Sequence, residues 1–367
     1  MLTKPSSGPS ALTQTMHFPF HRRATLKILS VTLTLQSLFG AEPPSIQPAA
    51  PSIWEPLASL PSGRAGFASS SSETHLVIAG GTRWENDVKL TLLDCLQYDL
   101  TSHSWSVAPP LPRAFAYGVD IASSGAWLLL GGDDGESTRA DGMWVPSEGT
   151  PNPHRTLSQP VALAGSTTLA GRLYVVGGTD DFRKLERATA QFFSLDAKSG
   201  LIRELPNVPG GPRILPAVAA FDGQVVAITG ARIGVGTAEV ENLTDAWCYS
   251  TVNEKWSAIA AYPFPVRGLT ACTLNSRYVL LAGGFRTSLV SSVPSAFTDN
   301  CFLYDAKDNR YLPLPPLPYS AMLGGLVRQG EFLYIVGGED RQRHRSALVY
   351  RTTVAKLFAA AGIATQP

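Results

Sequence analysis

A stretch that recurs along the chain decides the fold, and its clearest copy, at 278–311, reads YVLLAGGFRTSLVSSVPSAFTDNCFLYDAKDNRY. This copy starts with an apolar run that ends in Gly283-Gly284, continues with the pair Tyr304-Asp305, and ends at Tyr311. Similar apolar runs, each followed by glycine, recur at intervals of roughly 46 to 54 residues, at 76–79, 127–130, 173–176, 225–229, 278–282 and 332–336. A period in this range predicts an array of similar supersecondary units within one domain.

The order of apolar run, glycines, aromatic–Asp pair and later aromatic resembles the kelch repeat of β-propellers. The resemblance implies that each copy is a four-stranded antiparallel blade, with aromatic side chains packed between blades. Six copies predict an all-β, six-bladed kelch-type β-propeller. The last copy lacks a fourth strand, whereas residues 53–57 read as a strand without a repeat of their own. We therefore expect this N-terminal strand to complete the last blade and close the ring, which removes two free sheet edges.

Composition and charge exclude several classes of protein. The 30 Lys and Arg residues against 29 Asp and Glu leave a formal charge of +1, and only 16% of the residues are charged. Such a chain lacks the basic field that nucleic-acid binding needs, so we expect no nucleic-acid partner. The 44% hydrophobic content excludes global disorder. The 33 Gly and 28 Pro residues favour short strands and tight turns over helices.

The N-terminal region has the pattern of an export signal. A basic stretch at 22–27 precedes an apolar run at 28–39, which is too short to span a bilayer comfortably. We expect four segments: a leader at 1–41, a linker at 42–52, the propeller at 53–354 and a tail at 355–367. Export implies a periplasmic or secreted bacterial protein with no membrane span once the signal is removed. The alternative for 1–41 is a leader with no role in export.

Cysteine and histidine form no recognisable metal or nucleophile motif in the sequence. Four cysteines, Cys95, Cys248, Cys272 and Cys301, are spaced unlike any zinc pattern. Equivalent positions in a radial array of blades are too far apart for a disulfide. We therefore expect all four to be small buried apolar residues. No pair of histidines has the spacing of metal ligands, and we expect no metal site.

Charged residues gather where the blades are expected to meet at one mouth of the central channel. In a propeller blade, the innermost strand starts at the face where the second strand ends. Arginine opens the innermost strand in four repeats, and a guanidinium group binds a carboxylate through two hydrogen bonds. The mouth is thus expected to bind a small anion, and its candidate substrate-binding residues are Arg64, Arg113, Arg213 and Arg267. The alternative is that these arginines pair with loop acids or with backbone carbonyls.

Glu339 and Arg345 are the candidate catalytic pair, six residues apart on the loop that follows the second strand of the sixth repeat. A carboxylate beside a guanidinium group can act as general acid and base while the cation holds the charge of the substrate. The spacing does not single out this pair, because Asp133 and Arg139 repeat it in the second repeat. An ordinary loop acid is the alternative for Glu339.

Two stretches extend the resemblance to a particular family. Residues 112–137, with AYGV at 116–119 and LLLGG at 128–132, resemble the final blade of the N-acetylneuraminate epimerases, which are sialic acid mutarotases. The segment PGGPR at 209–213 is similar to an early blade of that family. The order is therefore rotated, and it resembles the cyclically permuted branch. A closed ring permits such a permutation, because moving the chain break keeps every contact between blades.

The resemblance also implies a reaction. In the rotated register, Glu339 and Arg345 match the proton-accepting glutamate of the family and its neighbouring arginine, although Ser346-Ala347 stands where the family has Thr-Asp. The chain is then an isomerase that interconverts the α- and β-anomers of free N-acetylneuraminate, with Arg345 and channel arginines such as Arg213 on the carboxylate. Its expected partner is a small anionic sugar, and no cofactor is needed because no electrons move.

Two alternatives stay open at this point. The first is a non-catalytic exported kelch propeller that binds a glycan or a protein partner. The second is a different mutarotase, or a sugar lyase, on the same scaffold. The sequence does not predict the oligomeric state.

Overall fold

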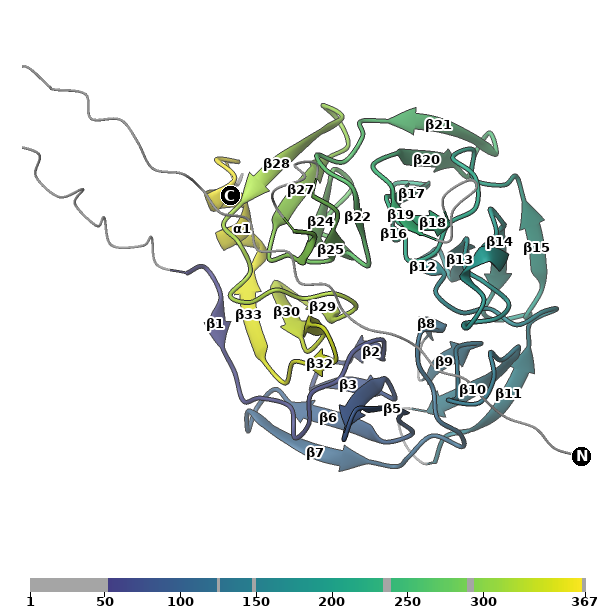
Figure 1. Cartoon of the computed structure of the whole chain (residues 1–367). Helices are drawn as coiled ribbons and strands as arrows, with labels where there is room; N and C mark the ends of the chain where they lie inside the picture. Colours follow the sequence, from purple (N-terminus) through teal and green to yellow (C-terminus); the bar gives the residue numbers. More distant parts are fainter. Residues whose placement is uncertain (1–51, 124–125, 147–149, 234–238, 289–293, 365–367) are drawn as a thin grey trace, which may run out of the picture. The chain divides into compact units, whose positions relative to one another are not determined.

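The computed structural model describes residues 52–364 except for 124–125, 147–149, 234–238 and 289–293. The expected leader at 1–41 lies outside the described residues, and so does the expected linker apart from its last residue. Within the described residues, the compact unit Pro51–Pro367 is nearly all β and consists of many small antiparallel sheets (Figure 1). This architecture is consistent with a kelch β-propeller. In the described part of the chain, no helix has the length and apolar character to cross a membrane.

Six four-stranded sheets account for the repeats. The first consists of β2 (Ala68–Ser71), β3 (His75–Ala79), β6 (Cys95–Asp99) and β7 (Ser104–Ala108). The second consists of β8 (Val119–Ser123), β9 (Ala126–Leu130), β10 (Asp141–Pro146) and β11 (Asn152–Thr156). The third consists of β12 (Gly165–Leu169), β13 (Arg172–Val176), β14 (Phe192–Asp196) and β15 (Ile202–Leu205).

The remaining three sheets repeat this order of strands. The fourth consists of β16 (Ala217–Phe221), β17 (Gln224–Ile228), β20 (Ala246–Ser250) and β21 (Lys255–Ile259). The fifth consists of β23 (Thr270–Thr273), β24 (Tyr278–Ala282), β27 (Cys301–Asp305) and β28 (Arg310–Leu314). The sixth consists of β29 (Gly325–Gln329), β30 (Phe332–Val336), β33 (Val349–Thr353) and β1 (Glu55–Pro56). The apolar runs of the sequence are thus the second strands, and β24 is buried along its whole length because both of its faces are covered.

Short hairpins project between the second and third strands of several sheets. They pair β4 (Thr82–Glu85) with β5 (Val88–Thr91), β18 (Ala231–Ile233) with β19 (Val240–Asn242), and β31 (Glu339–Arg341) with β32 (His344–Arg345). In the fifth repeat, β25 (Phe285–Arg286) pairs with both β26 (Ala296–Phe297) and β22 (Val266–Arg267). The third repeat carries the 3-10 helix η1 (Leu185–Arg187) at this place. The β31–β32 hairpin carries the candidate catalytic residues Glu339 and Arg345.

The N-terminal strand joins the last sheet. β1 pairs antiparallel with β33, with Glu55 opposite Arg351 and Pro56 opposite Tyr350. A proline fits this strand because β1 is an edge strand, where a missing N–H costs no ladder hydrogen bond. The innermost strands contact one another in the cyclic order β2, β8, β12, β16, β23, β29 and again β2.

A belt of backbone hydrogen bonds links the six sheets near the starts of their innermost strands. The residues of this belt are Gly66, Tyr117, Leu163, Leu215, Gly268 and Leu323. Each one donates its N–H to the carbonyl of the belt residue in the preceding sheet, at N···O distances from 2.7 to 3.2 Å. The cycle is complete, because Gly66 donates to Leu323. All six residues have positive φ angles, from 53° to 67°, and the hydrogen bonds between sheets satisfy the backbone donors and acceptors of the belt.

The glycine pairs allow neighbouring sheets to touch. Gly284 donates its N–H to the carbonyl of Ala321 at 2.6 Å, and a Cβ on Gly283 would lie only 1.9 Å from that oxygen. Since the φ angle of Gly283 is also positive, at 73°, a larger residue does not fit there. The same contact joins the last repeat to the first, where Gly338 donates to the carbonyl of Arg64 at 2.8 Å.

The aromatic markers of the repeat face each other across the third and fourth strands. The cross-strand pairs, with ring centroids 5.1 to 5.3 Å apart, are Tyr98 with Trp105, Tyr249 with Trp256, and Tyr304 with Tyr311. The indole N–H of Trp105 donates to the carbonyl of Ala58 at 2.8 Å, and that of Trp256 donates to Pro206 at 2.7 Å. Each aromatic therefore fastens its sheet to the segment that leaves the preceding one.

The expected C-terminal tail begins with a helix, α1 (Val354–Ala360), in which the side chain of Thr353 accepts a hydrogen bond from the N–H of Lys356. Leu357 is fully buried in one apolar cluster with Trp54, and Lys356 pairs with Glu55 at 2.6 Å. The two ends of the described chain therefore hold each other at the sixth sheet.

All four cysteines are free. Cys95 and Cys301 are buried as expected, whereas Cys248 and Cys272 are only partly buried. Burial raises the pKa of the Cys95 thiol and of the Cys301 thiol to about 12, so both are protonated at neutral pH.

Candidate functional site

The residues that follow the glycines lie next to the belt, and we call this region the mouth. Each of them pairs with the residue that precedes a belt residue, as Glu339 does with Met322 and Asp133 with Ala116. The six equivalent positions hold Thr82, Asp133, Thr179, Ala231, Phe285 and Glu339. Two of these six are therefore carboxylates.

Glu339 and Arg345 face each other across the β31–β32 hairpin. They are register partners, and their carboxylate oxygen and guanidinium nitrogen lie 2.7 Å apart. The spacing of six arises from the tight turn between the strands, where Arg343 adopts a positive φ of 56°. The side chain of Arg345 is only 5% exposed and that of Glu339 is 18% exposed, so this ion pair is largely removed from water while the carboxylate stays accessible.

Arg345 extends the site to two other repeats. Its Nε donates to the hydroxyl of Thr82 at 3.3 Å, and Thr82 shares a hydrogen bond of 3.0 Å with the Tyr117 hydroxyl. Burial raises the pKa of Tyr117, so its phenol stays protonated at neutral pH. Glu339, Arg345, Thr82 and Tyr117 therefore form one polar chain from the sixth, first and second repeats.

Lys89, from the β4–β5 hairpin, lies next to this chain. Its Nζ is 4.3 Å from the ring centroid of Phe182 and 5.5 Å from that of Tyr117, and the two rings stack at 4.9 Å. Burial lowers the pKa of Lys89, and the positive charge of Arg345 lowers it further. The ammonium group thus lies beside the polar chain that Tyr117, Thr82 and Arg345 form.

Asp133, which occupies the position equivalent to Glu339, has a different partner from the one that its spacing indicates. Its carboxylate pairs with Arg183 at 2.8 Å, and its side chain is only 5% exposed. Arg139 instead pairs with Asp141 at 2.9 Å and with Asp134 at 3.5 Å. Asp133 and Arg139, although six residues apart like Glu339 and Arg345, therefore pair with other residues.

Arg267, a predicted substrate-binding arginine, is the backbone partner of Phe285, which occupies one of the six mouth positions. It immediately precedes the belt residue Gly268 and stacks over the ring of Phe285 at 4.6 Å. It also donates to the amide oxygen of Asn242 at 2.8 Å. Burial lowers the pKa of Arg267, whereas the charge of Glu339 acts in the opposite direction.

Arg64 and Arg213 have a different environment. Both lie two residues before the belt and are almost fully buried, with exposed fractions of 1% and 0%. Arg64 pairs with Asp94 at 2.8 Å, and Arg213 pairs with Asp245 at 2.7 Å. Each also donates to a backbone carbonyl at the end of the second strand of its own sheet. These guanidinium groups hold the second and third strands together. They therefore follow the alternative in which the arginines pair with loop acids and backbone carbonyls.

Arg113 does the same from a third register, four residues before the belt. It pairs with Asp141 at 3.0 Å and donates to the carbonyls of Ala114, Gly131 and Asp141. The four predicted arginines thus lie at three different positions relative to the belt. An arginine at any of three backbone positions has a side chain long enough to reach an acceptor near the belt.

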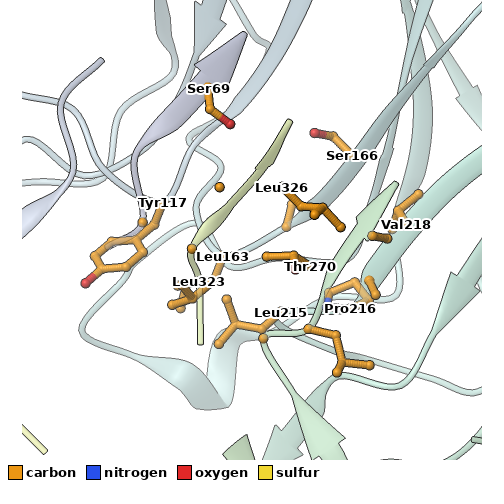
Figure 2. Close-up of a pocket in the computed structure, with 18 of the residues that line it drawn as sticks. Ser69, Tyr117, Leu163, Ser166, Leu215, Pro216, Val218, Thr270, Leu323 and Leu326 are labelled. Carbon is orange, nitrogen blue, oxygen red and sulfur yellow. The ribbon is translucent and has the colours of Figure 1, made fainter. Parts of the chain in front are cut away.

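A cavity of about 210 Å³ lies between the innermost strands (Figure 2). It is lined by the six belt residues and by small hydroxyl residues that include Ser69, Ser166 and Thr270, and no charged residue lines it. In Figure 2 the hydroxyl oxygen of Tyr117 points away from Ser69 and Ser166. The charged groups of the candidate site are thus not among the residues that line this cavity. Among the described residues, no group of three or more His, Cys, Asp or Glu side chains is placed to hold a metal ion.

Comparison with known proteins supports the repeat assignment. No protein-family model matches the chain. Beta-scruin of Limulus polyphemus is 22% identical over 191 residues, which are 51% of this chain and 20% of that protein. Kelch-like protein 35 of Mus musculus is 25% identical over 183 residues, 50% of this chain and 28% of its own length. Kelch repeat and BTB domain-containing protein 13 of Homo sapiens is 34% identical over 107 residues, 29% of this chain and 21% of its own length.

These similarities support a kelch-repeat family. The chain spans only 20% to 28% of the length of these curated relatives, so the similarity concerns the repeats and not the whole of each relative. The matches do not support membership of the sialic acid mutarotase family or a rotated order of blades. Family membership and blade order both stay predictions.

Three residues of the site were not among the sequence-based candidates. Lys89 lies in a hairpin that carries no motif, Thr82 follows the first glycine pair, and Tyr117 was noted only as part of a similar stretch. The signal for Thr82 was its position, since it occupies in the first repeat the place that Glu339 occupies in the sixth. No comparable signal exists for Lys89, because its proximity to Arg345 depends on how two hairpins pack.

Proposed function

We propose that the chain is a carbohydrate isomerase that interconverts the anomers of free N-acetylneuraminate at the mouth of the channel. The observation that carries this proposal is the Glu339–Arg345 ion pair, a partly accessible carboxylate held at 2.7 Å by a buried guanidinium group. The sequence resemblance to the mutarotase family supports the same two residues. The substrate is an acidic sugar, which fits a mouth that also contains Lys89 and Arg267.

The proposed mechanism moves one proton and breaks one bond. Glu339 takes the proton of the anomeric hydroxyl, the bond between C2 and the ring oxygen breaks, and the sugar opens to its 2-keto acid. Glu339 returns the proton to the former ring oxygen, so that the overall charge does not change. Rotation about the bond between C2 and C3 then exposes the opposite face of the ketone, and the reverse steps close the ring as the other anomer. Arg345, paired with Glu339 at 2.7 Å, stabilises negative charge that develops on oxygen.

The proposal includes a scaffold of six blades in one closed ring, with β1 as the fourth strand of the last blade. The cyclic belt of hydrogen bonds and the cyclic order of contacts between innermost strands support this closure. A closed ring positions Glu339, Thr82 and Tyr117 from three different repeats without relying on loop flexibility. Export of the protein and the domain limits at residues 41, 52 and 354 belong to the same proposal and have their support in the sequence alone.

The test is NMR of freshly released α-N-acetylneuraminate, whose conversion to the β-anomer is followed with and without protein. We expect the wild-type protein to speed the exchange, and we expect Glu339→Gln to lower the protein-dependent rate by about 100-fold or more, the usual contribution of a general acid–base group. Asp340→Asn is the matched control, because Asp340 is the next residue of β31 and pairs with His344. Loss of activity in both variants, or in neither, contradicts the role of Glu339.

A second candidate is a non-catalytic kelch propeller that binds a glycan or a protein partner. The similarity to kelch-repeat proteins favours it, because that similarity supports the scaffold and is independent of Glu339. The same NMR experiment separates the two functions. Saturable binding of a glycan together with an unchanged rate of anomer exchange supports the second candidate.

A further inference from the structure

The charged side chains that interact with Lys89 or with Glu339 include more cations than carboxylates. We name them and the uncharged residues beside them the mouth cluster: Thr82, Lys89, Tyr117, Asp133, Phe182, Arg183, Arg267, Glu339 and Arg345. Two ion pairs neutralise four of its charges, Glu339 with Arg345 at 2.7 Å and Asp133 with Arg183 at 2.8 Å. Lys89 and Arg267 are left, and neither has a carboxylate of the described chain within 4.0 Å.

The surroundings of Lys89 compensate its charge only in part. Its ammonium group lies over Phe182 at 4.3 Å and near Tyr117, and aromatic faces attract a cation more weakly than a carboxylate does. Burial and the charge of Arg345 both lower its pKa, which means that the site disfavours the ammonium form when empty. An anion bound beside Lys89 would remove this penalty.

The other cations are less suited to this task. Arg345 already engages Glu339, and Arg213 is locked to Asp245 within the fourth sheet. Arg267 donates to Asn242 and stacks on Phe285, which fixes its plane. Lys89 has three N–H donors, for which the structure records no hydrogen-bond acceptor among the described residues, and an ammonium group on a flexible stem adapts to a ligand.

We propose that Lys89 anchors the carboxylate of the sugar, and that it thereby selects sugar acids over neutral sugars. This inference rests on the proposed function, since a carboxylate on the anomeric carbon must lie close to the group that takes the anomeric proton. Lys89 lies 5.5 Å from the ring centroid of Tyr117, whose hydroxyl is linked through Thr82 to Arg345, and this position agrees with that requirement.

The experiment is calorimetric titration of the full chain with N-acetylneuraminate, with its methyl ester and with N-acetylmannosamine, which is neutral. Lys89→Met keeps an unbranched stem over Phe182, and Lys89→Arg keeps the charge. Lys198→Met is the matched control, because Lys198 is an exposed lysine on the turn between β14 and β15. We expect Lys89→Met to weaken N-acetylneuraminate binding by about tenfold to 100-fold, as for loss of a charged hydrogen bond, with no change for N-acetylmannosamine.

Two further results are expected. Lys89→Arg and Lys198→Met bind N-acetylneuraminate within about twofold of the wild type, since about 0.4 kcal/mol corresponds to that factor. The wild-type protein discriminates against the methyl ester by a factor similar to the effect of Lys89→Met. The ester measurement uses the wild-type protein, so it tests recognition of the sugar carboxylate even if Lys89→Met does not fold.

The inference is overturned if Lys89→Met binds N-acetylneuraminate as tightly as the wild type, if it weakens acid and neutral sugars equally, or if the wild type binds acid and ester alike. The outcome is distinguishable from failure of the proposed function. Charge-dependent binding through Lys89 without faster anomer exchange leaves the inference intact and rejects the isomerase. Fast anomer exchange that Lys89→Met does not slow supports the isomerase and rejects the role of Lys89.

Discussion

Arg213 offers a sharp test of the distinction between structural and ligand-binding arginines. Its guanidinium group is completely buried, donates twice to Asp245 at 2.7 and 3.2 Å, and donates to the carbonyl of Thr229 at 3.2 Å. Methionine at this position keeps much of the stem volume but removes all of these hydrogen bonds. The predicted consequence of Arg213→Met is a loss of stability with little direct effect on a ligand at the mouth.

The magnitude follows from the partners that are left behind. Breaking a buried ion pair costs about 3 to 5 kcal/mol, because the remaining charge loses its partner. Asp245 is 32% exposed and keeps a hydrogen bond of 2.6 Å from the indole of Trp247, so water and that bond relieve part of the penalty. The carbonyl of Thr229 loses the hydrogen bond that it accepts from Arg213, which contributes about 1 kcal/mol. We expect Arg213→Met to lower the free energy of unfolding by about 3 kcal/mol.

Urea unfolding followed by tryptophan fluorescence measures this loss. With an m value of about 3 kcal/mol/M, the midpoint should fall by about 1 M. The double variant Arg213→Met with Asp245→Asn should recover part of the stability, since no unpaired charge remains. If Arg213→Met unfolds at the wild-type midpoint yet binds N-acetylneuraminate more than tenfold weaker, the structural role is refuted and the guanidinium group contacts the ligand.

Two other features give predictions for stability. Burial raises the pKa of Asp120 to about 6, above its ordinary value of 3.8, so the folded state binds a proton that the unfolded state releases. The free energy of unfolding should therefore decrease as the pH rises from about 4 to 6. In Asp120→Asn the amide oxygen still accepts from the indole of Trp127, so this variant should gain about 1 to 3 kcal/mol of stability at pH 7 and lose the pH dependence in urea titrations. A variant that is less stable than the wild type at pH 7 contradicts this. In the belt, a Cβ on Gly66 would lie 2.3 Å from the ring of Tyr117, whereas one on Gly268 meets a flexible methionine at 2.8 Å. Gly66→Ala should therefore lower the melting temperature more than Gly268→Ala, and equal effects would show that positive φ alone sets the cost.

The repeat was predictable from sequence because each of its parts has a local physical cause. The apolar runs became second strands since they are covered on both faces, and Gly283 occurs where a side chain would collide with the carbonyl of Ala321. Trp105 and Trp256 could be placed because a large aromatic at a fixed spacing needs the same pocket in each repeat. The N-terminal strand followed from the unequal number of strands at the two ends of the chain.

The rest depends on contacts that leave no pattern in the sequence. The belt uses only backbone atoms, so Tyr117 and Leu163 occupy it as readily as Gly66 does. The arginines differ in register, because a long side chain reaches the same aspartate position from several starting points, as Arg113 and Arg213 do. Lys89 reaches the site through a hairpin, and only the packing of hairpins from different repeats brings it to Arg345.

The most direct test of the central claim is the electron density of N-acetylneuraminate in a crystal of the wild-type protein. We expect density at the mouth, with the anomeric oxygen within hydrogen-bonding distance of the Glu339 carboxylate and the sugar carboxylate beside Lys89. Density in the cavity lined by Ser69 and Ser166, or at the mouth with the anomeric carbon remote from Glu339, would contradict it.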